Sequence, residues 1–169
     1  MQVFLPYESF VQTAQCLDRA RLGSQRREAL LAIDTSIRVN LVEDNGKRVG
    51  WANHPTRLMW ADHLWLLCEY GKVICDEWLR RGYVDSTKTL FEQRQLMFDP
   101  KPYPSWLGNE SFHQSHRSNL IRKGEERLLK TGKSDILDRY RSLWPDTPSD
   151  LPYIWPVRKN KPKITFAQA

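Results

Sequence analysis

Residues 55–82 read PTRLMWADHLWLLCEYGKVICDEWLRRG, and this stretch decides the fold class of the chain. Apolar residues recur in it at intervals of three and four rather than two, which is the period of an amphipathic helix. Pro55 suits the first position of a helix and Gly82 suits its end. We therefore predict one long helix over residues 55–82, with these core or core-edge aromatics: Trp60, Trp65 and Trp78.

The helical period continues on both sides of this stretch. Toward the N-terminus it indicates helix up to about Asn40, with Gly23 as a candidate break and a turn at residues 44–46. Three further helices are expected toward the C-terminus: residues 86–98, a helix from the N-cap Asn109 to Gly124 or Leu129, and residues 134–144. No stretch alternates long enough for a sheet, so we predict an all-α fold, a single compact domain of about five helices.

The chain changes character after Pro145. Residues 151–156, LPYIWP, are apolar, aromatic and bounded by proline, and we expect them to lie extended across the helices. Residues 157–169 are basic and are typical of a loose tail. The predicted organisation is a helical domain over residues 1–156 followed by a basic, flexible tail over residues 157–169.

Composition narrows the classes of function. The 169 residues are 40% hydrophobic and 27% charged, which excludes a disordered chain. No run approaches the roughly 18 apolar residues of a membrane span, and the N-terminus lacks the pattern of a signal peptide. Three cysteines without CxxC spacing indicate buried thiols rather than a metal site. We expect a cytoplasmic monomer without cofactor, and the net charge of +6 favours a polyanionic partner.

The densest charged motif is residues 17–31, LDRARLGSQRREALL. Glu28 lies there beside Arg27 and just before an apolar stretch, so on a helix it sits at the edge of the buried stripe. One interpretation is a solvated helix face with pairing between charges four residues apart. The other is a carboxylate held by arginines in a DNA-facing cleft, where it stabilises positive charge developing on a sugar.

Three histidines are further candidates. His113 and His116 share one helical face, as two metal ligands would, but no neighbouring acid or cysteine completes a ligand set. Together with His54 they are more typical of hydrogen-bonded or phosphate-contacting histidines than of a metal hydrolase. Tyr153 and Trp155 can either stack on unpaired bases or pack internally. Positive charge beside the histidines comes from Arg117, Arg122 and Lys123.

Taken together, these residues resemble the pyrimidine-dimer DNA glycosylases, small all-α enzymes also called endonuclease V, in a diverged bacterial or phage-like branch. The resemblance rests on residues 1–5, 17–32, 53–83 and 112–123. It implies a glycosylase that flips nucleotides around a lesion and attacks the sugar with its own N-terminal α-amine, assisted by a glutamate of the first long helix. The imine so formed also permits strand cleavage at the abasic site.

Carried over to this chain, the resemblance makes Met1 the amine, Glu28 the glutamate and Arg27 a contact to the phosphates or the flipped site. An α-amino group suits this chemistry because its unperturbed pKa is roughly 7.7–8.0, against about 10.4 for lysine. Gln2 is too large for the usual removal of Met1. The partner is then duplex DNA with a damaged or modified base. The expected nucleic-acid-binding residues are Gln2, Arg21, Arg26, Arg27, His54, His113, His116, Arg117, Arg122, Lys123, Tyr153 and Trp155.

Several alternatives stay open at this point. Met1 and Gln2 stand where the best-known family member has Thr and Arg, and the interval from Met1 to Glu28 is longer than in the family. Residues 151–156 replace an aromatic-basic ending, so another damaged or modified base is an alternative to the dimer. Glu28 can instead activate water as a general base. A non-catalytic DNA-binding module that uses the positive charge is the remaining alternative.

Overall fold

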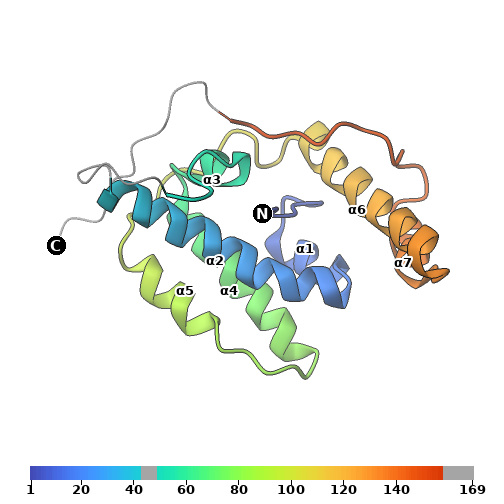
Figure 1. The fold of residues 1–169 in the computed structure, drawn as a ribbon, viewed down its shortest axis with the longest axis horizontal. Coiled ribbons are helices and arrows are strands. Elements are labelled where there is room, and N and C mark those ends of the chain that lie inside the picture. Colours follow the sequence, from blue (N-terminus) through green and yellow to red (C-terminus); the bar gives the residue numbers. More distant parts are fainter. Residues whose placement is uncertain (43–48, 158–169) are drawn as a thin grey trace. The chain divides into compact units, whose positions relative to one another are not determined.

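A computed structural model describes residues 1–42 and 49–157 of the chain. The described residues contain seven helices and no strand, which confirms the predicted all-α class (Figure 1). The helices are α1 Phe10–Cys16, α2 Arg19–Val42, α3 Pro55–Trp60, α4 Leu64–Arg80, α5 Lys88–Gln95, α6 Glu110–Thr131 and α7 Asp135–Leu143. The described residues have seven helices rather than the predicted five, because the first two predicted helices are each divided in two.

Within this helical domain the described residues form two compact units, each assembled from separated parts of the chain. The first unit contains Met1–Val3, Leu22–Pro104 and the described residues from Trp155 onward. The second unit contains Phe4–Arg21 and Ser105–Ile154. Most of α2 therefore belongs with α3, α4 and α5, whereas α1, α6 and α7 belong together.

In the first unit, α4 packs closely against α5 and reaches α2 through the Trp78 side chain. Gly71 of α4 faces Phe91 of α5, and a Cβ at Gly71 would overlap the phenyl ring. Gly23 of α2 faces Trp78 of α4, where a Cβ would lie 3.1 Å from the indole. Fully burying a large apolar side chain such as Phe91 contributes about 1.5–3 kcal/mol. Both glycines thus allow aromatic side chains to fill the space between helices.

The prediction of one helix over residues 55–82 was wrong in one respect, because the structure has two helices there, α3 and α4, with a break between them. The His63 N–H donates to the Trp60 carbonyl at 2.8 Å, which closes a tight turn. Ala61 and Leu64 are buried on either side of the turn, so the hydrophobic period runs through it. The candidate break at Gly23 is absent, since α2 is continuous from Arg19 to Val42.

In the second unit, α6 begins at the predicted N-cap. The Asn109 side chain accepts a hydrogen bond from the Phe112 N–H at 3.1 Å. The helix continues past Gly124, the earlier of its two expected ends, because this glycine lets α7 approach: a Cβ there would lie 2.9 Å from the Leu137 Cα. The helix ends instead at Gly132, whose φ of 69° is left-handed and favours glycine.

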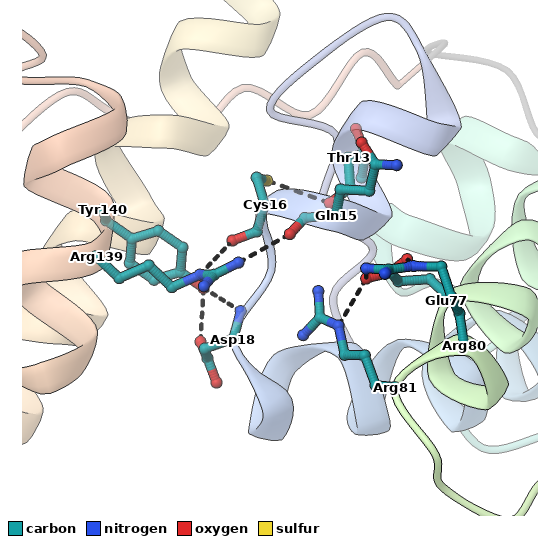
Figure 2. Close-up of polar contacts among 9 residues, drawn as sticks. All are labelled: Thr13, Gln15, Cys16, Asp18, Glu77, Arg80, Arg81, Arg139 and Tyr140. Atoms are coloured by element: carbon teal, nitrogen blue, oxygen red, sulfur yellow. Dashed lines mark hydrogen bonds and ion pairs between the residues drawn. The ribbon is translucent and has the colours of Figure 1, made fainter.

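Side chains of α7 fix the end of α1 and the start of α2 (Figure 2). Arg139 donates to the carbonyls of Cys16 and Gln15 at 2.9 and 2.8 Å, so it satisfies carbonyls that the end of α1 leaves without helical partners. Tyr140 donates its hydroxyl hydrogen to Asp18 at 2.6 Å. Burial raises the pKa of Tyr140, and the Asp18 carboxylate raises it further.

The end of α4 carries a buried carboxylate that two arginines hold (Figure 2). Arg80 and Arg81 each donate an Nε–H to Glu77 at 2.6 Å. The hydrogen bonds from Arg80 lower the pKa of Glu77 although burial opposes them. Glu77 is therefore an ionised anchor for the last turn of α4.

Residues 151–157 have no regular secondary structure. Within the second unit, the Leu151 N–H donates to Ser118 of α6 at 3.1 Å and the Ile154 N–H donates to Ser115 at 3.2 Å. This part follows α6 in an extended form, as predicted. The predicted turn at 44–46 and residues 158–169 of the predicted tail lie outside the described residues, so both stay predictions. None of the described helices has the length and apolar character needed to cross a membrane.

All three cysteines are free, buried and helical, as predicted. Cys16 belongs to α1 in the second unit, and Cys68 and Cys75 belong to α4 in the first. Burial raises the pKa of both Cys68 and Cys75 to about 12. These thiols therefore remain protonated and behave as small apolar side chains.

Candidate active site

The chain's amino group lies beside Glu28 in the first unit. The distance from the Met1 nitrogen to the Glu28 Oε2 is 3.6 Å, and the Gln2 N–H donates to the same oxygen at 3.1 Å. The Met1 side chain is fully buried, whereas 31% of the Glu28 side chain is exposed. The longer interval between the two residues thus folds back and brings the amine to the carboxylate, at the boundary between interior and solvent.

Side chains from three helices fix the backbone of the first two residues. Thr56 of α3 donates to the Met1 carbonyl at 3.2 Å, and Gln25 of α2 donates to the Gln2 carbonyl at 3.1 Å. The Tyr70 hydroxyl of α4 in turn donates to the Gln25 side chain at 2.9 Å. Gln25, Thr56 and Tyr70 are all buried. A fixed backbone restricts the amine to a narrow range of positions, which is what a nucleophile requires.

His54 lies at the start of α3, next to these groups. Its Nδ1 accepts a hydrogen bond from the Thr56 N–H at 3.1 Å, so the proton of the neutral ring is on Nε2. Burial lowers the pKa of His54, the positive chain terminus lowers it further, and Glu28 raises it. His54 is thus within electrostatic range of both the amine and the carboxylate, and it is neutral at pH 7.

Two tryptophans surround the His54 ring. The ring centroid of Trp51 lies 5.3 Å from that of His54, and the centroid of Trp155 lies 5.8 Å from it, both edge-on. Trp51 is 55% exposed and has a φ of 67°. A left-handed backbone at a bulky residue costs about 1–3 kcal/mol, so it persists only where its surroundings impose it. Two tryptophan rings therefore lie edge-on to His54.

Of the two arginines before Glu28, only one faces solvent. Arg27 is exposed on α2. Arg26 forms an ion pair with Asp85, and its guanidinium lies 4.2 Å from the centre of the Trp78 ring. Burial opposes ionisation of Asp85, but hydrogen bonds from Thr87, Lys88 and Arg26 lower its pKa overall. Arg26 thus links α2 to the segment after α4, whereas Arg27 is accessible to a phosphate.

A sequence model described as pyrimidine dimer DNA glycosylase matches residues 1–90, which is just over half of the chain. The matched segment contains Met1, Glu28 and His54, and of the groups around the amine only Trp155 lies outside it. This chain belongs to the pyrimidine dimer DNA glycosylase family. The substrate class of this family is DNA. No curated protein and no solved structure matches the chain.

In this glycosylase-family chain, two of the predicted DNA-contacting histidines face the interior instead. The His116 Nδ1 accepts the Leu5 N–H at 2.9 Å, and the His113 Nδ1–H donates to the Leu5 carbonyl at 2.7 Å. The Gly108 N–H donates to the His113 Nε2 at 3.0 Å, which fixes that tautomer. Both imidazoles are buried and neutral, since burial lowers the pKa of His113 and, to a greater extent, of His116. We therefore correct their assignment from DNA contact to holding the N-terminal segment.

The other predicted DNA-binding residues of the second unit differ in accessibility. Arg117 donates to the Pro6 carbonyl at 2.8 Å and to Glu110 at 2.6 Å, so its guanidinium is engaged internally. Arg21 is paired with Asp18 at 3.6 Å. The hydroxyl of Tyr153 lies 3.0 Å from the His116 Nδ1, and the two rings are 4.3 Å apart, which is internal packing. Two residues of α6 remain partly exposed, Arg122 and Lys123.

The described residues do not provide a ligand set for the metal site that the histidines offered as an alternative. Among residues 1–42 and 49–157, no group of three His, Cys, Asp or Glu side chains could hold a metal ion. His113 and His116 share a helical face as predicted, but both use their Nδ1 atoms on the backbone of Leu5.

Four residues of the site were not among the sequence candidates: Gln25, Trp51, Thr56 and Tyr70. Gln25 and Thr56 contact the carbonyls of residues 2 and 1, and Tyr70 contacts Gln25, all across 23 or more positions of sequence. Such pairing has no local pattern. Trp51 carries a weak local signal, since it follows Gly50 and precedes Asn53-His54-Pro55.

Proposed function

We propose that this chain excises a damaged or modified pyrimidine base from duplex DNA with the Met1 α-amine as the nucleophile. The amine lone pair attacks C1′ of the sugar, and the C1′–N bond to the base breaks. The base leaves with the bonding electron pair and takes up the proton that the amine loses. The C1′–O4′ bond then opens, O4′ takes a second proton from solvent, and the nitrogen lone pair forms the C=N bond of an iminium ion.

The observation that carries this proposal is the 3.6 Å distance between the Met1 nitrogen and the Glu28 carboxylate. A carboxylate at this distance can accept the proton that the amine loses and pass it to the base. It also stabilises the positive charge that develops on the sugar. The buried Met1 side chain supports this role because it limits the movement of the amine.

We further propose an abasic-site lyase step from the same intermediate. The iminium group acidifies the C2′ protons, and removal of one of them breaks the C3′–O bond and releases the 3′ phosphate. Glu28 is the base that we assign to this step, because it faces the amine that carries the sugar. Strand cleavage would then follow base release on one enzyme molecule.

For DNA binding, the accessible cations are the best candidates. Arg27 is exposed one residue before Glu28, and Arg122 and Lys123 are partly exposed on α6. The net charge of +6 gives the chain a general attraction for phosphates. Action as a monomer, location in the cytoplasm and independence of cofactors stay predictions.

Borohydride trapping tests the proposal on two labelled duplexes, one UV-irradiated with a single thymine dimer and one with a preformed abasic site. We expect a covalent adduct with both, and peptide mass spectrometry should place the sugar remnant on the Met1 nitrogen. An adduct on a lysine would overturn the assignment of Met1. Base release without an adduct would instead favour water activated by Glu28. Steeply salt-dependent binding with neither product would indicate a non-catalytic module.

A one-residue extension supplies a sharper test of the amine. A glycine added before Met1 moves the amine by about 3.5 Å, so it removes the contact with Glu28 while the rest of the chain is unchanged. Trapping should then fall to background on both duplexes. Undiminished trapping by the extended chain would contradict the proposed nucleophile.

A further inference from the structure

The Met1 amine is attached to a peptide group whose two polar edges are both held by side chains. The Met1 carbonyl accepts the Thr56 hydroxyl at 3.2 Å, and the Gln2 N–H of the same peptide group donates to Glu28 at 3.1 Å. A peptide group is planar, so holding its two edges also fixes the position of the Met1 Cα. The rotation that still moves the amine nitrogen is therefore the one about the Met1 Cα–C bond.

The Met1 side chain restricts this remaining rotation. The side chain and the amine are both attached to Cα, so a turn about the Cα–C bond moves the two together. Because the side chain is fully buried, such a turn would have to displace closely packed neighbours. Burial of the side chain thus holds the amine nitrogen 3.6 Å from the Glu28 carboxylate.

Thr56 is placed so that its hydroxyl can hold the first peptide group. It is the second residue of α3, so no turn of that helix precedes it to accept the hydroxyl hydrogen. Its N–H donates to His54 at 3.1 Å, its side chain is fully buried, and a β-branched side chain has few rotamers. The fold therefore directs the hydroxyl of Thr56 at the Met1 carbonyl.

Gln25 holds the next peptide group from the helix that also carries Glu28. The two side chains are three positions apart on α2, and they bind the two polar groups of Gln2, the carbonyl and the N–H. A carbonyl only accepts, so the Gln25 amide turns its NH₂ group to Gln2 and its oxygen to the buried Tyr70 hydroxyl. Residues 1 and 2 are thus fixed relative to the Glu28 carboxylate.

We propose that Thr56 and Gln25 are positioning residues for the Met1 nucleophile, and that the buried Met1 side chain completes the alignment. This inference rests on the proposed function and specifies how the amine is aimed at C1′ of the sugar. Misplacing a reacting group by 1 Å costs about 10²-fold in rate. These groups act on the amine rather than on DNA, so their loss should lower the rate at saturating DNA and leave the affinity unchanged.

Single-turnover borohydride trapping on the abasic-site duplex separates rate from affinity. Thr56→Val keeps the shape of the side chain and removes the hydroxyl donor. Its maximal trapping rate should fall about 10- to 100-fold at an unchanged half-saturating DNA concentration, and Thr56→Ser should keep most of the rate. Thr13→Val is a matched control, because Thr13 is also fully buried and donates to the Tyr7 carbonyl at 3.2 Å. It should lose similar stability toward urea but no trapping rate.

Two more comparisons test the other parts of the alignment. Tyr70→Phe removes the hydroxyl that orients Gln25, whereas Tyr140→Phe removes an equally buried hydroxyl of the second unit. Only Tyr70→Phe should slow trapping. Met1→Gly, exposed by cleavage of a fusion protein, keeps an amine at residue 1 but frees its rotation, so trapping should slow. Met1→Leu, made in the same way, should keep most of the rate.

The results distinguish failure of this inference from failure of the proposed function. An undiminished trapping rate in Thr56→Val, or equal losses in Thr56→Val and Thr13→Val, would overturn the positioning role. A higher half-saturating DNA concentration at an unchanged maximal rate would also overturn it, because Thr56 would then act in DNA binding. Failure of the wild-type chain to trap the abasic site, or an adduct on a lysine, would instead reject the proposed function itself.

Discussion

The two units hold the beginning of the chain in opposite ways. In the first unit, the polar groups around Met1 and Gln2 include two opposite charges and reach solvent through Glu28. In the second unit, Leu5 is held by two neutral imidazoles that are completely enclosed. Both arrangements use polar side chains on helices. The comparison teaches that charge combined with access to solvent, rather than polarity, separates the proposed reactive site from an anchor.

The histidines make the same point within one residue type. His54 caps α3 through its Nδ1 and lies near two charged groups. His116 uses its Nδ1 on a backbone N–H and is 0% exposed. Substitutions in the two regions should therefore affect different quantities, activity in the first and stability in the second.

The largest expected effect is that of Glu28→Gln on base excision. We expect excision to fall about 10²- to 10⁴-fold, because the amide can neither accept the amine proton nor stabilise positive charge on the sugar. Glu69→Gln is a matched control, since Glu69 lies in the same unit and its side chain is also 31% exposed. Single-turnover kinetics on the thymine-dimer duplex measure both. Full activity of Glu28→Gln would contradict both the mechanism with the amine as nucleophile and the mechanism with water activated by Glu28.

In the second unit, His116→Ala should act on stability instead. The substitution leaves the Leu5 N–H buried without its acceptor and opens a cavity, which costs about 2–4 kcal/mol of the free energy of unfolding. Urea denaturation followed by circular dichroism measures this loss. Under conditions where the variant is folded, its excision rate should stay within a few-fold of wild type. A large loss of activity without a loss of stability would erase the contrast between the two units.

Gly71→Ala and Gly124→Ala test the packing of the two units separately. The new methyl group meets the Phe91 ring in the first unit and the Leu137 backbone in the second. Overpacking of this kind costs about 1–3 kcal/mol, less any gain in helix propensity. Gly124→Ala should cost more, because a backbone yields less than a ring. Denaturation curves should show a lower midpoint for both, and an unchanged midpoint for Gly124→Ala would contradict the close approach of α6 and α7.

The last expected effect is a gradual one, a pH dependence of stability from the buried histidines. Burial lowers the folded-state pKa of His113 and His116 below 6.5, so the unfolded chain binds more protons as the pH falls below that value. Each histidine should then reduce the free energy of unfolding by at most about 1.4 kcal/mol per pH unit, between pH 6.5 and its own folded-state pKa. Urea titrations from pH 7.5 to 5 test this, and His116→Gln should show a shallower slope. An identical slope in that variant would exclude His116 as a source.

Sequence patterns predicted helices well and their interruptions poorly. The Asn109 cap and the start of α7 near residue 134 follow local rules, and both are confirmed. Gly23 was a candidate break and Gly124 one of two candidate ends, yet each makes room for a partner helix. The break after Trp60 has neither glycine nor proline, so it left no mark on the hydrophobic period. Tertiary packing decides these points, and it has no local signature.

The candidate site shows the same division. The resemblance pointed to Met1 and Glu28, and the structure brings them together. Gln25, Thr56 and Tyr70 went unnoticed because the contacts of Gln25 and Thr56 with residues 2 and 1, and that of Tyr70 with Gln25, exist only in the folded chain. For His113 and His116 the sequence left hydrogen bonding and phosphate contact both open, because a histidine that holds a backbone looks, in sequence, like one that contacts a phosphate.

The buried thiols give each unit a built-in reporter of its own opening. Cys16 lies in the second unit, and Cys68 and Cys75 lie in the first. An alkylating reagent reacts with a thiolate, and enclosed thiols react only when the surrounding structure opens. Mass spectrometry of the alkylated peptides therefore times the opening of each unit without any engineered probe. Unequal rates for Cys16 and Cys68 would show which half of the enzyme loosens first.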